Sequence, residues 1–246
     1  MTQLSVNVNK IATLRNTRDL EIPNLVKLST VVLDAGAKGI TVHPRPDQRH
    51  IRPYDVDALA RLVSKYSGRE YNIEGNPFHG LVEHCLRVCP HQATLVPDAR
   101  EALTSNHGWN LIELESESQQ ALRWSIEKLH ETGARVSLFL DPFEAMMPIA
   151  KRLGADRVEL YTEPFAAGFA QGRATEAVEP YVRAAAAARD NGLGINAGHD
   201  LNLDNLRYFL EQVGRVDEVS IGHALIADAL EFGLKSAVEQ YLAKCG

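Results

Sequence analysis

Three side chains able to transfer protons lie where short runs of β-branched or small apolar residues end: His43, Glu74 and His199. Imidazole and carboxyl groups act as general acids and bases when their pKa lies near the working pH, and burial raises a carboxyl pKa toward that range. Burying a carboxylate costs free energy unless it has a partner or a chemical task. We therefore predict that these three residues are catalytic, with structural pairing as the alternative for Glu74.

Cationic side chains gather in the stretch GITVHPRPDQRHI, just after one of these apolar runs. Arginine binds phosphate oxygens through paired donors, so Arg45, together with His50 and the earlier Arg18, indicates recognition of an anion. Arg49 of the same stretch is interpreted as a charge that faces solvent. The sequence therefore predicts a phosphate-binding group close to the acid–base residues.

Two later runs end in the same small pattern, Asn-Ala-Gly198-His199 and Ser-Ile-Gly222-His223. Glycine lets backbone N–H groups come close to an anion. We expect a second phosphate to bind near these two glycines.

The spacing of possible metal ligands argues against a metal site. His43 and His50 are seven residues apart, and neither HExxH nor a comparable ligand spacing occurs. The G-x-G-x-x-G turn of dinucleotide-binding proteins and the P-loop pattern are missing as well. The ligand spacing therefore predicts a site without a metal, and the missing dinucleotide and P-loop patterns argue against an open doubly wound sheet.

The elements that must position these residues alternate along the chain as short strands and longer helical patterns. The expected strands cover residues 4–11, 38–44, 70–76, 92–98, 135–142, 156–163, 194–200 and 218–224. Eight such strand–helix units in 246 residues predict an α/β protein that forms one (β/α)8 TIM barrel with extra helices, a single domain over residues 1–246. An open doubly wound sheet is the alternative.

Strand parity favours the barrel. In the first expected strand Val6 and Val8 alternate with Asn7 and Asn9, and the second, third and sixth expected strands alternate in the same way. Apolar residues would face the helices, while polar residues would face the barrel interior and its C-terminal rim. Active sites of this fold lie at that rim.

Composition and charge limit the partners. A net charge of −6 argues against nucleic acid, which needs a continuous basic surface. The chain shows no signal-peptide pattern and no apolar run long enough for a bilayer, and its three cysteines are an odd number, typical of a reducing compartment. We expect a cytoplasmic protein that acts on small phosphorylated molecules, with neither nucleic-acid nor membrane partners.

Six segments in order resemble the pyridoxine 5'-phosphate synthase family: VNVNKIATLRNTR, GITVHPRPDQRHI, NIEGNP, ATLVPDAREALTSNHGW, INAGHD and SIGHALI. The resemblance extends over essentially the whole chain. It implies a cytoplasmic homo-octamer of TIM barrels that needs no metal or cofactor. It also implies a reaction of vitamin B6 biosynthesis, in which 1-deoxy-D-xylulose 5-phosphate and 3-amino-2-oxopropyl phosphate condense to pyridoxine 5'-phosphate, inorganic phosphate and water.

The resemblance assigns a role to each matching position. His43 and Glu74 match proton acceptors, and His199 matches the proton donor. Contacts to the deoxyxylulose phosphate are implied for Arg45, His50 and Thr104, and contacts to the aminoketone phosphate for Asn7, Arg18, Asp200, Gly222 and His223.

The chain departs from the commoner family form at three positions: Asn9-Lys10 replaces Asp-His, and Asp200 replaces Gly. We still predict that Asn9 and Lys10 contact substrate, with the Lys10 ammonium directed to a phosphate. Because the acid–base trio is intact, the sequence indicates an active variant branch. A non-catalytic sugar-phosphate-binding barrel and another phosphosugar lyase or isomerase of the same fold are the alternatives.

Overall fold

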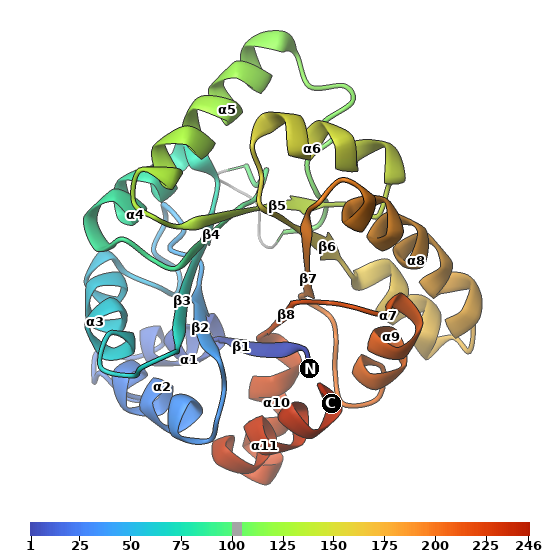
Figure 1. Cartoon of the computed structure of the whole chain (residues 1–246). Coiled ribbons are helices and arrows are strands. Elements are labelled where there is room, and N and C mark those ends of the chain that lie inside the picture. Colours follow the sequence, from blue (N-terminus) through green and yellow to red (C-terminus); the bar gives the residue numbers. More distant parts are fainter. Residues whose placement is uncertain (100–104) are drawn as a thin grey trace.

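The computed structural model describes residues 1–99 and 105–246, and within them eight parallel strands close into a barrel in chain order (Figure 1). The strands are β1 (Gln3–Asn7), β2 (Gly39–Val42), β3 (Glu70–Gly75), β4 (Gln92–Leu95), β5 (Arg135–Leu140), β6 (Arg157–Tyr161), β7 (Gly194–Gly198) and β8 (Glu218–Ile221). β1 pairs with both β2 and β8, which closes the sheet. The predicted (β/α)8 barrel is confirmed.

Helices surround the barrel (Figure 1). They are α1 (Asn9–Asn16), α2 (Leu25–Asp34), α3 (Pro53–Val63), α4 (Val82–Val88), α5 (Ser116–His130), α6 (Met147–Leu153), α7 (Glu163–Ala170), α8 (Ala174–Asp190), α9 (Leu206–Val213), α10 (His223–Phe232) and α11 (Leu234–Lys244), with the short turns η1 (Pro77–Leu81) and η2 (Glu144–Met146). Pairs of helices follow β1, β6 and β8, which are the extra helices expected. Within the described chain, no helix has the length and apolarity needed to cross a bilayer.

The strands bury both of their faces, but with different residues. Apolar side chains such as Val6, Ile40 and Ile73 pack outward against the helices, and all three are fully buried. The inward face is largely polar: the Ser5 and Thr41 hydroxyl oxygens lie 2.7 Å apart, and hydrogen bonds continue along this layer. Branched apolar residues more often fill barrels of this fold. Here the alternating residues face the helices and the barrel interior as predicted, and charged groups in this interior have polar neighbours.

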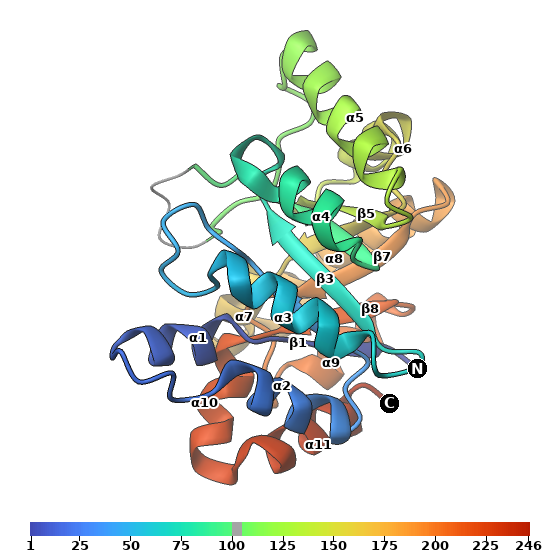
Figure 2. The same cartoon turned by 90° about the vertical axis from the view of Figure 1, so that its left-hand side faces the viewer.

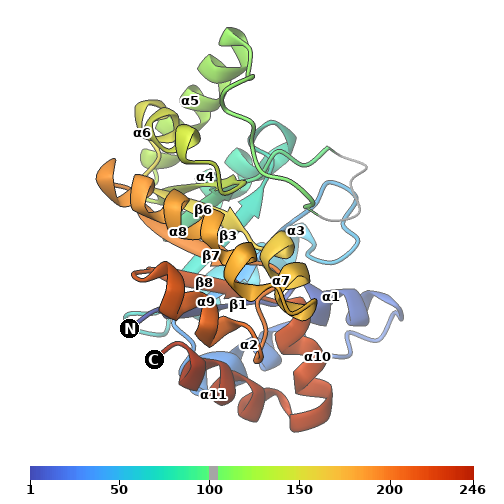
Figure 3. The ribbon, with the colours of Figure 1, turned by 90° about the vertical axis from the view of Figure 1, so that its right-hand side faces the viewer.

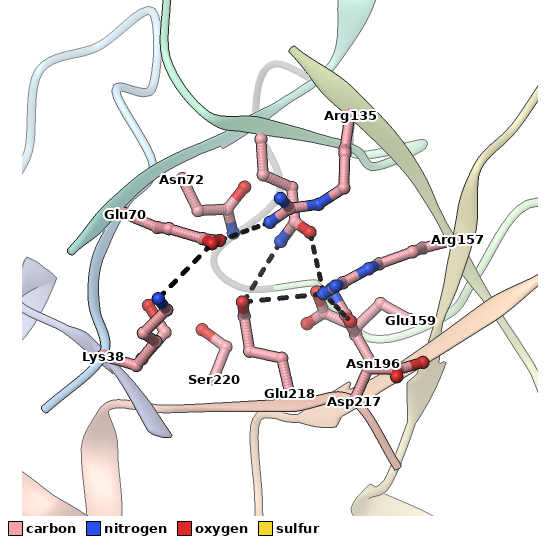
Figure 4. A network of polar contacts seen from close by, with 12 residues as sticks. Lys38, Glu70, Asn72, Arg135, Arg157, Glu159, Asn196, Asp217, Glu218 and Ser220 are labelled. Carbon is pink, nitrogen blue, oxygen red and sulfur yellow. Dashed lines mark hydrogen bonds and ion pairs between the residues drawn. The ribbon is translucent and has the colours of Figure 1, made fainter. Parts of the chain in front are cut away.

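The N-terminal ends of the strands form a barrel floor of paired charges (Figure 4). Arg135 and Lys38 both form ion pairs with Glu70. Arg157 lies 3.7 Å from the carboxylate of Glu218, and its Nη1 donates a 3.0 Å hydrogen bond to the Asn196 side chain. These residues close the barrel at this end.

The opposite end of the barrel is more open. Figures 2 and 3 show both chain termini at the floor end, whereas α1 and the loop after β2 project at the C-terminal ends of the strands. Residues placed at strand ends by the sequence therefore share one side of the molecule.

Each observed strand ends before its predicted end, and the largest difference is in the first strand. The first strand was expected to continue to residue 11, but β1 ends at Asn7 and α1 begins at Asn9. The Asn7 side-chain oxygen accepts a 3.0 Å hydrogen bond from the backbone N–H of Asn9, which turns the chain out of the strand. Asn9 and Lys10 therefore lie on a helix, and their alternation with Val8 does not reflect a strand.

Candidate active site

A cavity of about 390 Å³ opens at the C-terminal ends of the strands. This volume lies in the range of small-molecule sites. Of the predicted site residues, the structure brings together the following at the cavity wall: Asn7, Asn9, Lys10, His43, Arg45, His50, Glu74, His199, Asp200, Gly222 and His223. Strand ends that are far apart in sequence thus supply one site.

Glu74 lies near the end of β3 on the inward face. Its carboxylate accepts hydrogen bonds from the Asn7 side-chain amide at 3.3 Å and from the Ser220 hydroxyl at 3.5 Å. Burial raises the pKa of Glu74 to about 7; the nearby imidazole of His199 opposes this rise, and the Glu218 carboxylate adds to it. A carboxyl group with this pKa can both accept and release a proton at neutral pH.

His43 directly follows β2 and is buried. Its backbone N–H donates a 3.0 Å hydrogen bond to the side-chain oxygen of Asn9. Burial, followed by the charge of Arg45, holds the pKa of His43 well below its usual value. The imidazole is therefore neutral at neutral pH and able to accept a proton.

His199 follows β7 with a left-handed backbone, φ 78°. Its Nδ1 lies 2.5 Å from a carboxylate oxygen of Asp200. Burial acts to lower the pKa of His199, but the hydrogen bond and charge of Asp200 outweigh it, and the pKa is raised. His43 and His199 are thus shifted in opposite directions within one cavity, which suits them to accept and to donate protons, respectively.

The first two residues of α1 differ in what they contact. The Asn9 side chain supports the backbone of His43, as described above, while Lys10 is exposed at the cavity wall. An amide oxygen can accept that backbone N–H as well as a carboxylate oxygen can. Replacing the commoner Asp by Asn9 is therefore compatible with this contact.

The loop after β2 supplies the cationic wall. Arg45 is buried and forms an ion pair with Asp98, whose carboxylate also accepts a 2.7 Å hydrogen bond from the Ser105 hydroxyl. Arg49 lines the cavity and lies 2.5 Å from Asp47, so its interpretation as a purely solvent-facing charge was wrong. Both guanidinium groups are held in place by carboxylates.

His50 belongs to the same wall and is fixed in one orientation. Its Nδ1 accepts a 2.9 Å hydrogen bond from the backbone N–H of Ile51. Burial, followed by the charges of Arg45 and Arg49, lowers the pKa of His50 to about 4. The ring is neutral at pH 7 and carries its proton on Nε2, which makes that nitrogen a hydrogen-bond donor.

The two glycines of the repeated pattern have separate structural reasons. A Cβ on Gly198 would lie 2.2 Å from the carbonyl oxygen of Ser220, so glycine is needed for the close approach of β7 and β8. A Cβ on Gly222 would lie 3.0 Å from that of Asn7. Gly222 is the residue before α10, and its neighbour His223 begins that helix at the cavity wall. The N-terminus of α10 therefore presents backbone donors at this side of the site.

Two predicted contacts remain, Arg18 and Thr104. Arg18 follows α1, is exposed and does not line the cavity. Thr104 lies outside the described residues.

Glu159 is a cavity residue that the sequence placed on the inward face of its strand but did not select for the site. It lies on β6, is buried, and accepts a 3.5 Å hydrogen bond from the Thr94 hydroxyl. Burial, followed by the Glu74 carboxylate, raises its pKa well above the usual value. The signal available was its parity, because a carboxylate on an inward strand position is costly without a task.

The described residues contain no group of three or more His, Cys, Asp or Glu side chains arranged to hold a metal ion. The groups that can act on a substrate here are proton donors, proton acceptors and anion-binding cations.

Solved structures similar to this chain share its fold. Thiamine phosphate pyrophosphorylase from Pyrococcus furiosus superposes with a TM-score of 0.62 at 14% identity, covering 99% of this chain and 95% of the other. The tryptophan synthase alpha chain of Legionella pneumophila gives a TM-score of 0.65 at 11% identity, covering 99% and 91%. At such low identity these similarities concern the barrel alone.

Sequence comparisons go further. Residues 4–246 match the family model described as "Pyridoxal phosphate biosynthesis protein PdxJ". The pyridoxine 5'-phosphate synthase of Albidiferax ferrireducens is 52% identical over 248 residues, covering 98% of this chain and 96% of that protein. The protein of the same name from Porphyromonas gingivalis is 50% identical over 241 residues, covering 98% of both chains. The chain therefore belongs to the family of the pyridoxal phosphate biosynthesis protein PdxJ.

Proposed function

We propose that this chain is a pyridoxine 5'-phosphate synthase of vitamin B6 biosynthesis. It condenses 1-deoxy-D-xylulose 5-phosphate with 3-amino-2-oxopropyl phosphate and releases pyridoxine 5'-phosphate, inorganic phosphate and water. Joining an amine to a ketone, losing water, expelling phosphate and closing a ring are successive proton transfers between two bound anions.

One observation carries the proposal: Glu74, with a pKa of about 7, shares its cavity with two imidazoles whose pKa values are shifted in opposite directions. The neutral His43 accepts a proton, Glu74 accepts and returns one, and His199 donates one to the departing group. Asn7 and Ser220 hold the Glu74 carboxylate in position for this exchange. The Glu218 carboxylate disfavours ionisation of Glu74 and helps to keep its pKa near neutrality.

The two phosphates bind at different walls. Arg45 and the Nε2–H of His50 hold the deoxyxylulose phosphate, with Lys10 available on the facing helix. The backbone donors at Gly222 and His223, at the start of α10, hold the aminoketone phosphate, because a helix N-terminus favours an anion. The two reacting ends then meet near Glu74.

The test is product formation by the purified chain with both substrates, followed as pyridoxine 5'-phosphate and as released phosphate. We expect turnover by the natural chain and a loss of about 10² to 10⁴ in kcat for Glu74→Gln, the range of a general acid–base contribution. Glu211→Gln, on the exposed side of α9, is the matched control and should keep full activity. Thermal stabilisation by the substrates without product would support a non-catalytic binding barrel instead.

We also propose that the chain works as a cytoplasmic homo-octamer. The position of Arg18 supports assembly. Arg18 is exposed and lies outside the cavity of its own chain, although a phosphate contact is expected of it. Light scattering of the purified protein measures the assembly directly, and a monomer at working concentrations would contradict it.

A further inference from the structure

Asp200 occupies a position where the resemblance to the family leads us to expect a substrate contact, yet its carboxylate is directed to a neighbouring side chain. The Oδ2 of Asp200 lies 2.5 Å from the Nδ1 of His199. Both side chains line the cavity, and both are about one third exposed, at 35% for His199 and 32% for Asp200. An imidazolium that donates to a carboxylate forms a charge-assisted hydrogen bond.

The backbone fixes both members of this pair. His199 has a φ of 78°, and its N–H donates a 3.2 Å hydrogen bond to the carbonyl oxygen of Ser220. The N–H of Asp200 lies 3.5 Å from the hydroxyl oxygen of Thr162, and the carbonyl oxygen of Asp200 accepts a 3.4 Å bond from the Asn205 side chain. Because β8, Thr162 after β6 and the segment before α9 all hold this turn, the carboxylate has a fixed place beside the imidazole.

The imidazole is also held from the other side. The ring of Tyr161 meets the ring of His199 edge-on, with centroids 6.0 Å apart. The charged or titratable groups of the described residues that face or share the cavity with His199 are, besides Asp200, Glu74 of β3, Asp98 after β4, Glu159 and Tyr161 of β6, Lys10 of α1, His223 of α10, and His43, Arg45, Arg49 and His50 after β2. The Asp200 carboxylate lies in hydrogen-bond contact with the ring.

We propose that Asp200 is a positioning residue for His199: it fixes the tautomer and orientation of the imidazole and holds it as the protonated donor. With the Nδ1–H bonded to Asp200, the proton that is transferred leaves from Nε2. The Nε2–H bond breaks as the leaving oxygen gains the proton, and the imidazolium becomes a neutral imidazole that keeps its Nδ1–H on Asp200. The commoner family form has glycine at this position, whereas here the Asp200 carboxylate adjusts the protonation of His199.

The negative charge also has a cost at this place. A carboxylate at the wall of a cavity that takes two phosphates repels them, since like charges disfavour one another. Removing the charge is therefore expected to leave the KM values unchanged or to lower them. A residue that holds substrate would behave in the opposite way.

The test compares Asp200→Asn, Asp200→Ala and, as a matched control, Asp204→Asn. Asparagine can still accept the bond from Nδ1–H but carries no charge, whereas alanine removes both. Asp204 is an exposed carboxylate four residues further on, outside the cavity. The first readout is the titration of His199 by NMR in the full-length protein with labelled histidine, with the signal identified by its absence in His199→Gln.

We expect the pKa of His199 to fall by about one unit in Asp200→Asn, as for loss of a neighbouring opposite charge, and to be unchanged in Asp204→Asn. A proton donor is active below its pKa, so the high-pH limb of the kcat profile moves to lower pH by the same amount. Above that limb kcat falls about tenfold, because one pKa unit is a factor of ten in the protonated fraction. Asp200→Ala should show the same shift and a further fall in kcat from the loosened ring.

The inference rests on the proposed function for its kinetic consequence, but the titration does not. If the natural chain forms no product and His199 still titrates lower in Asp200→Asn, the pairing stands and the proposed function fails. An unchanged pKa of His199 in Asp200→Asn overturns the inference. So does a raised KM with an unmoved pH limb, which would assign Asp200 to substrate binding.

Discussion

The two ends of the barrel interior hold carboxylates in different electrostatic settings. At the floor, burial opposes ionisation of Glu70, but the hydrogen bond and charge of Arg135 lower its pKa below the usual value. Burial raises the pKa of Glu218 to about 6 even though Arg157 stabilises its charge. At the C-terminal end, within the described residues, the hydrogen-bond partners of Glu74 are the neutral Asn7 and Ser220, and its pKa reaches about 7.

The comparison shows how one barrel separates stability from chemistry. Glu70, paired with the Arg135 guanidinium, stays ionised and supports the fold, whereas Glu74, given neutral partners, titrates near neutrality and can exchange protons. Glu218, whose cation lies 3.7 Å away, is intermediate. Cations at the cavity are not missing, but Arg45 and Arg49 pair with Asp98 and Asp47 at the wall. Their placement leaves the pKa of Glu74 high.

The largest effect is expected from breaking the floor. Arg157→Met removes the ion-pair partner of the buried Glu218, which keeps a hydrogen bond from the Gln92 amide, and it removes the donor to the side-chain oxygens of Gln92 and Asn196. We expect the free energy of unfolding to fall by about 3 to 5 kcal/mol, the usual cost of removing one partner of a buried pair. Urea unfolding measures it. The folded variant should keep its kcat, and a variant as stable as the natural chain would contradict the structural role of the floor.

The variant Glu74→Gln tests the C-terminal end of the barrel through its effect on the free energy of unfolding. Because the folded pKa of Glu74 is raised above that of an unfolded Glu, its ionised form destabilises the protein as pH rises toward and beyond 7. Above pH 7, the free energy of unfolding of the glutamine variant should therefore exceed that of the natural chain by about 2 to 3 kcal/mol.

The gain from Glu74→Gln should shrink as pH falls and vanish near pH 4, where the carboxyl group is protonated in both states. Thermal unfolding at several pH values measures this, with Glu211→Gln as the exposed control. A destabilised Glu74→Gln variant at pH 8 would show that the carboxylate has a structural partner after all.

The sequence was informative where a pattern repeats. The alternation of Ile40 and Val42 with Thr41 and His43 follows from a strand that packs helices on one side and a polar barrel interior on the other. Such parity supported the barrel that the eight strand–helix units predict, and it placed His43 and Glu74 on the inward face. His199 was found from the Gly-His pattern that two later strands share. Burial on each face is a local property, so a single sequence records it.

Contacts that depend on local backbone conformation or on strand tilt could not be predicted in the same way. The pairing of His199 with Asp200 depends on a left-handed backbone at a residue other than glycine, which the sequence does not reveal. Asn9 does not belong to the strand, because its backbone N–H donates a hydrogen bond to the Asn7 side chain. The floor charges Glu70 and Arg135 begin their strands, and whether such residues face the axis or solvent depends on strand tilt, which the sequence does not specify.

A smaller effect is expected at the cationic wall. His50→Asn keeps an acceptor for the backbone N–H of Ile51 but removes the Nε2–H expected to hold a phosphate. We expect the KM for the deoxyxylulose phosphate to rise about tenfold, the worth of one hydrogen bond of about 1.4 kcal/mol, with a lesser change in kcat. Steady-state kinetics measures both constants. A fall in kcat at constant KM would place His50 among the proton-transfer groups instead.

The smallest effect is expected at the solvent-exposed edge of the floor, where Lys38 pairs with Glu70. Lys38 lies 3.8 Å from Glu70 and keeps 28% of its side chain exposed, so water screens the pair. Lys38→Met should lower the free energy of unfolding by less than about 1 kcal/mol, since Arg135 still neutralises Glu70 and partly exposed ion pairs contribute little. The loss should shrink further in 1 M salt, whereas that of Arg157→Met should persist because the buried pair is poorly screened. Equal losses for the two variants would mean that the floor acts as one network and that burial does not rank its ion pairs.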